Sequence, residues 1–239
     1  MTKLEVCIDN LESLHTAQAA GADRIELCSA LALGGLTPSF GLMQQAAHHA
    51  RIPVYAMIRP RAGDFCFSDA ELALMALDIA AARQAGLQGV VVGLLDDTGR
   101  VPGDALERLV QAAGPLGVTF HRAIDLSCDW RADLEVIVSA GCERILSSGQ
   151  AASAEAGLQT LGEMQRQLAG RASLMPGAGV NAGNVQKILA ACAVNEVHMS
   201  GMVWRGSALQ SGVAMGSNDD GRINVVDADK IRAVRRLLG

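Results

Sequence analysis

Residues 3–28 read KLEVCIDNLESLHTAQAAGADRIELC, which predicts a strand, a helix and a second strand in close succession. The apolar runs Lys3–Ile8 and Asp23–Cys28 predict the strands, and Asn10 is a suitable N-cap for a helix over Leu11–Ala20. The AGADRI ending of this helix returns as AGCERI at residues 140–145, so the same helix-to-strand turn is used twice. The unit therefore predicts an α/β fold built from repeated strand–helix pairs.

The rest of the chain continues this alternation without a visible linker. Helical patterns from Ser68 or Asp69 to Ala85, over Asp104–Ala113 and over Leu134–Ala140 each end at a glycine. The chain has eight predicted strands and 239 residues, close to the roughly 250 of a (β/α)₈ barrel. We therefore predict one α/β domain that spans residues 1–239 and forms a single (β/α)₈ TIM barrel. A doubly wound open sheet is the structural alternative. The predicted strands are Lys3–Ile8, Asp23–Cys28, Pro53–Ile58, Gly89–Leu94, Gly117–His121, Arg144–Ser147, Ala172–Met175 and Glu196–Met199.

The composition excludes several classes of function. Half of the residues are hydrophobic but only 3% are aromatic, so the core must be aliphatic. A net charge of −5 argues against nucleic acid or an anionic membrane as a partner. The chain has neither a signal-peptide pattern nor an apolar run long enough to span a membrane. Its six cysteines are widely spaced without a CxxC pair, so we expect a cytoplasmic protein with reduced thiols.

The C-terminal part contains the least regular stretch of the chain. Arg205–Asn224 is rich in glycine, serine, asparagine and aspartate, so we expect a mobile or partly disordered loop after the last strand. Asp227–Leu238 then has Ile231, Val234 and Leu238 at helical spacing. This final helix should close the barrel.

The most informative motif for function is E-x-C, which occurs on both of the first two predicted strands. Glu5 and Cys7 share one face of the first strand, and Glu26 and Cys28 share one face of the second. If both faces look into the barrel, two carboxylates and two thiols converge. The thiols are then either soft-metal ligands for Cu(I) or zinc, or small buried side chains that pack as hydrophobes. The carboxylates belong either to a structural ion pair or to a functional site.

Charged residues also follow the third and fifth strands, at the end where barrel enzymes carry their active sites. Arg59 and Arg61 in MIRPRAGDF are placed either to pair with Glu26 or to hold an anionic ligand. His121 in VTFHRAID either acts as an acid, a base or a metal ligand or is simply hydrogen-bonded at the strand end, and Asp125 follows it in the loop. These residues, together with Glu5 and Glu26, are the candidate catalytic set.

The loops after the seventh and eighth strands are candidates for anion binding. Gly177 and Gly179 let the backbone approach an anion, and Ser200 and Gly201 add donors. Such GxG turns also serve packing alone, and GAGVNAG lacks the spacing of the dinucleotide fingerprint. A nicotinamide cofactor is therefore not expected.

Six ordered segments resemble the CutC family of copper-homeostasis proteins. They are LEVCIDNLES, AGADRIELCSALALGGLTPSFGL, IPVYAMIRPRAGDFCFSDAEL, VTFHRAIDL, RILSSGQ and MPGAGVN. The resemblance implies a barrel, a cytosolic location, a homodimer or higher homo-oligomer, and a link to copper with Cys7 and Cys28 as the Cu(I) ligands. Cys66 and Ser147 stand where the family usually has other residues, away from the proposed ligands.

The sequence is compatible with three alternative functions. The first is a Cu(I)-binding copper-homeostasis protein whose cofactor or cargo is copper. The second is a barrel enzyme of unknown reaction that acts on a small anionic or phosphorylated substrate, with Glu5 or Glu26 and His121 moving protons and Arg59 and Arg61 holding the anion. The third is an interaction protein with a fossil site. Whether the protein is an enzyme is not decided by the sequence.

Overall fold

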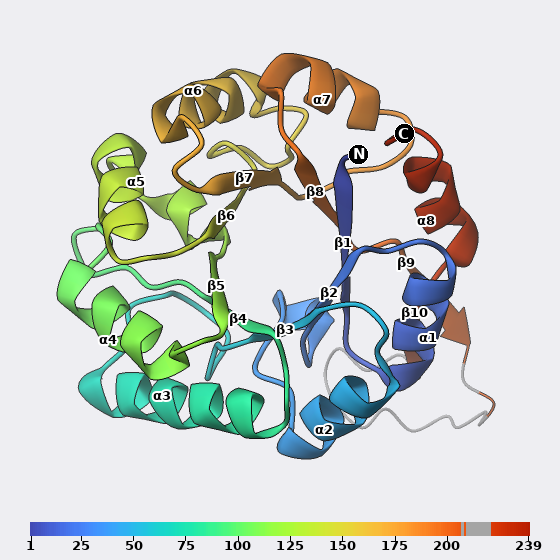
Figure 1. The fold of residues 1–239 in the computed structure, drawn as a ribbon, viewed down its shortest axis with the longest axis horizontal. Helices are drawn as coiled ribbons and strands as arrows, with labels where there is room; N and C mark the ends of the chain where they lie inside the picture. The colour runs from blue at the N-terminus through green and yellow to red at the C-terminus, as the bar shows by residue number, and fades with distance from the viewer. Residues whose placement is uncertain (207, 209–220) are drawn as a thin grey trace.

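Eight parallel strands form the centre of the computed structural model, which describes residues 1–206, 208 and 221–239 (Figure 1). Hydrogen-bonded neighbours follow the order β7-β6-β5-β4-β3-β2-β1-β8, and β7 lies next to β8, so the sheet curls into a barrel. The (β/α)₈ barrel prediction is therefore confirmed. The strands are β1 Lys3–Ile8, β2 Arg24–Leu27, β3 Val54–Met57, β4 Gly89–Val92, β5 Gly117–Phe120, β6 Arg144–Ser147, β7 Ser173–Pro176 and β8 Glu196–Met199.

The described residues form eight α-helices, which surround the strands on the outside (Figure 1). The predicted caps are present, because Asn10 accepts from the backbone N–H of Ser13 and Ser68 forms a capping box with Glu71. Of these helices, none has the length and apolar character needed to cross a membrane in the described part of the chain. The helices are α1 Leu11–Ala19, α2 Phe40–His49, α3 Asp69–Gln84, α4 Gly103–Ala113, α5 Trp130–Ser139, α6 Leu158–Leu168, α7 Val185–Cys192 and α8 Ala228–Arg235.

Two segments differ from the sequence-based expectation by more than three residues. Helix α5 begins at Trp130 rather than Leu134, because the side chain of Asp129 caps it by accepting from the N–H of Ala132. The ends of the expected loop are strands, since β9 Met202–Gly206 pairs antiparallel with β10 Arg222–Val226. The remainder of the expected mobile loop, residues 207 and 209–220, lies outside the described residues.

Inward-facing side chains fill the barrel in layers, as the alternation along each strand requires. In the lower part, Tyr55 occupies space that two glycines leave free. A Cβ atom on Gly89 would lie 2.3 Å from the Tyr55 ring, and one on Gly117 would lie 2.2 Å from its hydroxyl. Glycine at these two positions therefore allows a large polar ring inside the barrel.

Candidate functional site

A cavity of about 380 Å³ opens at the carboxyl ends of the strands, within the size range of small-molecule sites. Its walls come from six different strands or the loops that follow them, so the barrel as a whole positions the site. The lining residues are Cys7, Glu26, Leu31, Leu33, Gly34, Met57, Arg59, Phe65, His121, Arg122, Leu146, His198, Ser200 and Met202.

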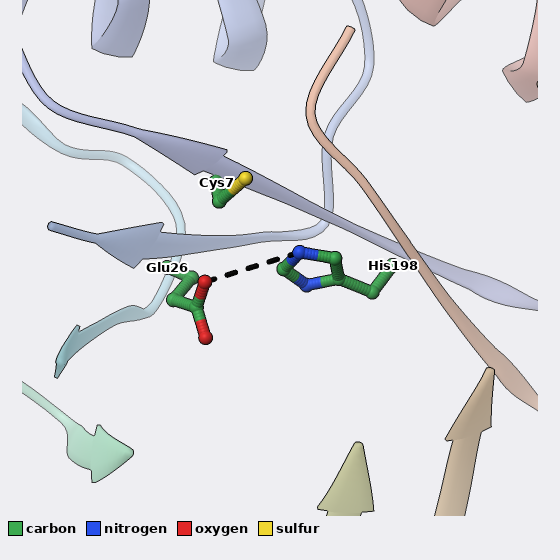
Figure 2. Close-up of side chains that lie close together, drawn as sticks. All are labelled: Cys7, Glu26 and His198. Carbon is green, nitrogen blue, oxygen red and sulfur yellow. Dashed lines mark ion pairs between the residues drawn. The ribbon is translucent and has the colours of Figure 1, made fainter. Parts of the chain in front are cut away.

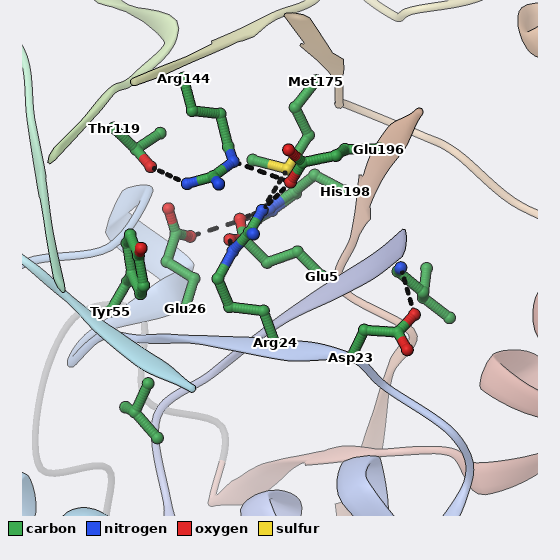
Figure 3. A network of polar contacts seen from close by, with 12 residues as sticks. Glu5, Asp23, Arg24, Glu26, Tyr55, Thr119, Arg144, Met175, Glu196 and His198 are labelled. Atoms are coloured by element: carbon green, nitrogen blue, oxygen red, sulfur yellow. Dashed lines mark hydrogen bonds and ion pairs between the residues drawn. The ribbon is translucent and has the colours of Figure 1, made fainter. Parts of the chain in front are cut away.

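A buried ion-pair network lies beneath this cavity (Figure 3). The Arg24 guanidinium donates to the carboxylates of Glu5 and Glu196. Arg144 donates to Glu196 at 2.8 Å and to the Thr119 hydroxyl at 3.0 Å. Burial opposes the charge on Arg24, but the two carboxylates outweigh it and raise the Arg24 pKa above its usual value. Charges of both signs are thus satisfied inside the barrel, which is the condition for burying them.

His198 connects this network to the cavity. Its Nδ1 lies 2.8 Å from Oε1 of Glu5, and its Nε2 lies 3.9 Å from Oε2 of Glu26. Burial alone would lower the His198 pKa, but Glu26, Cys7 and Glu5 raise it well above its usual value. Burial likewise opposes the charge on Glu5, yet the bonds from His198 and Arg24 lower the Glu5 pKa to about 2. The geometry therefore favours an imidazolium held between two carboxyl groups.

Three residues that line the cavity, Cys7, Glu26 and His198, form a compact group (Figure 2). One potential ligand atom from each lies within 4.8 Å of the other two, and all three residues are buried. Burial raises the Cys7 pKa despite the neighbouring His198, which favours the protonated thiol. Burial also raises the Glu26 pKa, to about 7, against the opposing charge of His198.

Cys28 faces the barrel interior beside Glu26, but it lies next to the cavity rather than on its wall. Its thiol donates to Oε2 of Glu26 over 3.7 Å, and it packs with Tyr55, Met57 and Val91. Burial, followed by the charge of Glu26, raises the Cys28 pKa well above its usual value. The two E-x-C faces therefore both point into the barrel, which was the condition for their side chains to converge. Of the two thiols, only that of Cys7 reaches the cavity.

His121 lies on the opposite wall with a defined tautomer. Its Nδ1 accepts a hydrogen bond from the backbone N–H of Ala123 at 3.1 Å, so the ring proton of the neutral imidazole is on Nε2. This Nε2 is buried and has no partner among the described residues. Burial and the nearby Arg59 lower the His121 pKa to about 3, so the ring is neutral at physiological pH.

Arg59 is a buried cation that binds backbone carbonyl groups instead of the expected Glu26. It donates to the carbonyl oxygens of Leu33 at 3.0 Å, Gly35 at 3.3 Å and Gly63 at 2.8 Å. Its Nε has no partner within the described part of the chain, and the residue is only 7% exposed. Pairing with Glu26, one of the two alternatives for Arg59, is therefore wrong, because the loops after β2 and β3 hold the guanidinium.

Arg61 and Asp125 do not line the cavity. Arg61 points outward, with its Nε 2.5 Å from Glu71 and its Nη1 2.9 Å from Asp64, so its alternative pairing with Glu26 is also wrong. The reason is that Glu71, the capping-box residue of α3, and Asp64 hold the Arg61 guanidinium on the outside. Asp125 accepts from Arg122 at 2.8 Å and from the Ser147 hydroxyl at 2.6 Å, which ties the loop after β5 to β6.

The predicted anion-binding loops line a second cavity of about 390 Å³, next to the first. Gly179, Ser200 and Gly201 are part of its wall, and Ser200 lines both cavities. Gly177 instead allows close packing, because a Cβ there would lie 2.5 Å from Leu146. The N–H groups of Asn181 and Gly183 are already bonded to nearby asparagine side chains, which reduces the donors available to an anion.

The sequence reasoning missed His198 as a site residue. The signal was present, because EVH at residues 196–198 repeats the E-x-C spacing of the first two strands with histidine in place of cysteine. Its significance depends on the parallel pairing of β1 with β8, which aligns Glu5 with His198.

Known proteins resemble this chain over nearly its whole length. A relative from Vibrio campbellii, named as a family protein CutC, is 55% identical over 238 residues, 96% of each chain. One of the same name from Photobacterium profundum is 52% identical, covering 97% of each chain. A crystal structure from Streptococcus agalactiae, described as a putative copper homeostasis protein CutC, is 33% identical with a TM-score of 0.79, over 83% of this chain and 98% of that one. The family model for CutC matches residues 2–203, and the chain therefore belongs to the CutC family.

Proposed function

We propose that the cavity is the active site of an enzyme that binds a small anionic molecule and acts on it by acid–base chemistry. The supporting observation is that three buried polar atoms around this one cavity lack partners: Oε1 of Glu26, Nε of Arg59 and Nε2 of His121. They are three of the five such side-chain atoms among the described residues. Because a buried polar atom without a partner costs free energy, their concentration in one cavity favours a polar ligand there.

The charges in the cavity indicate which kind of ligand fits. Arg59 brings a positive charge that no carboxylate in the described part of the chain neutralises. An anionic group of the ligand would supply that partner and would accept from the free Nε–H. His121 adds a neutral N–H donor, and Glu26 adds an oxygen that can take or return a proton.

Ligand binding is tested by thermal shift with phosphorylated and carboxylated metabolites. We expect at least one of them to raise the melting temperature of the wild-type protein, and Arg59→Met to abolish that shift. Arg108→Met is the matched control, because Arg108 is exposed on α4 and lies outside both cavities. A failure of every anionic compound to shift the wild-type melting temperature would contradict the proposal.

A second candidate function is Cu(I) binding, as the description of the Streptococcus agalactiae relative suggests. The specific observation in its favour is the grouping of Cys7, Glu26 and His198 within 4.8 Å. Thiolate and imidazole suit Cu(I), and the Met57 thioether lines the same cavity, so the donor set fits. Binding would require the Cys7 thiol and the His198 imidazolium to lose their protons, which is the reason that we rank this candidate second.

Copper binding is tested by anaerobic competition with a Cu(I) chelator. The candidate predicts that affinity falls in a Cys7→Ser, Cys28→Ser double variant, whereas Cys142→Ser leaves it unchanged because Cys142 is buried away from the site. An unchanged affinity in the double variant would refute the assigned ligands.

We also propose a cytoplasmic location and self-association. All six cysteines are free, in keeping with a reducing compartment. Trp204 and Ile223 are exposed on β9 and β10, which makes this hairpin a candidate surface for a homodimer or higher homo-oligomer. Light scattering of the wild-type protein and of a Trp204→Ser variant tests the contact.

A further inference from the structure

We infer that the cavity catalyses proton transfer at a carbon atom next to a carbonyl group, in a small substrate that also carries a carboxylate or phosphate. Glu26 is the base, His121 is the hydrogen-bond donor to the carbonyl oxygen, and Arg59 holds the anionic group. The inference rests on the proposed acid–base function and adds the reaction class and the substrate class to it.

His121 is suited to a carbonyl oxygen because of the way its ring is held. The backbone N–H of Ala123 occupies Nδ1 at 3.1 Å, which leaves Nε2 as an N–H donor with a fixed direction. The ring also packs on Phe65, with the ring centroids 4.9 Å apart. A neutral imidazole donor of this kind stabilises the negative charge that develops on a carbonyl oxygen when a neighbouring carbon loses a proton.

Arg59 packs on the same aromatic ring as His121. Its guanidinium lies over Phe65 at 4.8 Å from the ring centroid, and three backbone carbonyl groups hold its terminal nitrogens. Its free Nε therefore belongs to a rigidly held guanidinium, and Arg59 lines the same cavity as the His121 donor. The two donors match a carbonyl oxygen and an anionic oxygen on neighbouring parts of one small molecule.

Glu26 has one oxygen engaged and one free. Oε2 accepts from the Cys28 thiol and faces His198, whereas Oε1 has no partner among the described residues. Because Glu26 lines the same cavity as His121 and Arg59, its free oxygen can take a proton from the bound substrate.

The proposed step is balanced without a co-reactant. The carbon–hydrogen bond breaks, its proton goes to Oε1 of Glu26, and its electron pair forms a carbon–carbon double bond as the carbonyl π electrons move onto oxygen. The resulting enolate oxygen accepts from the N–H of His121. Return of the proton from Glu26 to the same carbon restores the carbonyl group and the Glu26 carboxylate, and it gives the epimer where that carbon is a stereocentre.

Solvent deuterium exchange followed by proton NMR tests the inference. The probes are dihydroxyacetone phosphate and 2-oxobutanoate, which pair a carbonyl with a phosphate or a carboxylate. We expect the wild-type protein in D₂O to remove the signal of the hydrogens next to the carbonyl of at least one probe, faster than a protein-free blank. No exchange above the blank with either probe overturns the inference.

Variants separate the base, the donor and the general fold. Glu26→Gln should slow exchange by about 10²–10⁴-fold, and His121→Asn, which keeps an acceptor for Ala123 but removes the Nε2 donor, by about 10²–10³-fold. Glu107→Gln, exposed on α4, is the matched control and should exchange like the wild type. Unchanged exchange in a folded Glu26→Gln or His121→Asn protein overturns the assigned roles.

Thermal shift with the same probes separates a failure of the inferred reaction from a failure of the proposed binding site. A probe that stabilises the wild type without exchanging its hydrogens overturns the reaction class and leaves the binding site standing. Failure of all anionic compounds to bind overturns the proposed function itself.

Discussion

Two layers of the barrel interior contain the same kinds of residue but differ in how these residues are bonded. The lower layer is the ion-pair network beneath the cavity, and the upper layer lines the cavity. In the lower layer, Arg24 and Arg144 are bonded to Glu5 and Glu196, so each charge has a partner of opposite sign (Figure 3). In the upper layer, Glu26, Arg59 and His121 each keep one buried polar atom without a partner in the described structure. The completed bonds of the lower layer favour a structural role, and the incomplete ones of the upper layer are the basis of the proposed ligand site.

The largest expected difference between the layers is in stability. Arg24→Met leaves Glu5 and Glu196 without their shared cation, and breaking a buried pair in this way costs about 3–5 kcal/mol. Arg59→Met should cost far less, because its partners are backbone carbonyl groups at the mouth of the cavity. Urea unfolding of both variants measures the difference. Equal losses of unfolding free energy would break the comparison.

The second-largest expected effect is a loss of unfolding free energy in acid, through Glu5 of the lower layer. The Glu5 pKa of about 2 lies below its ordinary value of 4.5, so Glu5 contributes stability that is fully present above pH 4.5 and is lost as the pH falls toward 2. The loss from this group should be on the order of 2–3 kcal/mol. Urea unfolding at several pH values between 5 and 2 measures it. A flat unfolding free energy across this range would show that Glu5 is not held as a carboxylate.

Packing around Tyr55 should give an effect of intermediate size. Gly89→Ala would place a Cβ 2.3 Å from the Tyr55 ring, and such overpacking costs about 1–3 kcal/mol. Gly41→Ala is the matched control, since a Cβ there meets nothing within 4 Å and alanine favours the helix. Thermal unfolding of both variants is the measurement. A Gly89→Ala protein as stable as the control would mean that the lower layer has room to adjust.

The smallest expected effect on stability is for Glu26, the proposed proton acceptor in the upper layer. Glu26→Gln keeps the shape of the side chain and removes a carboxylate whose pKa burial already raises to about 7, so stability should change by less than about 1 kcal/mol. The same substitution should remove most of the deuterium exchange. Circular dichroism during urea unfolding measures the first and proton NMR the second. A large loss of stability would place Glu26 with the structural layer instead.

Much of the fold could be predicted from local patterns. Three strands, Lys3–Ile8, Arg144–Ser147 and Glu196–Met199, have the bounds that their apolar runs predict. The inward direction of the E-x-C faces follows from alternation once a barrel is assumed. The hairpin of β9 and β10 was missed, because glycine, serine and asparagine around it resemble a simple loop.

The partners of the charged residues could not be predicted in the same way. Arg61 binds Glu71, and Arg59 binds backbone carbonyl groups. Both pairings depend on the conformation of the loops in the folded protein. His198 acquires its role only through its contact with Glu5, 193 positions earlier in the chain. Sequence spacing indicates which residues face inward, whereas ion-pair partners depend on tertiary contacts.

The pairing of β1 with β8 has a consequence for synthesis of the protein. While the nascent chain is still short of Glu196, one edge of β1 lacks its neighbour, and Glu5 and Arg24 await partners that arrive 172 or more residues later. Exposed strand edges invite association with other chains. The last strand of the barrel to be synthesised therefore covers the edge of the first one, and the floor of the cavity is complete only when the barrel closes.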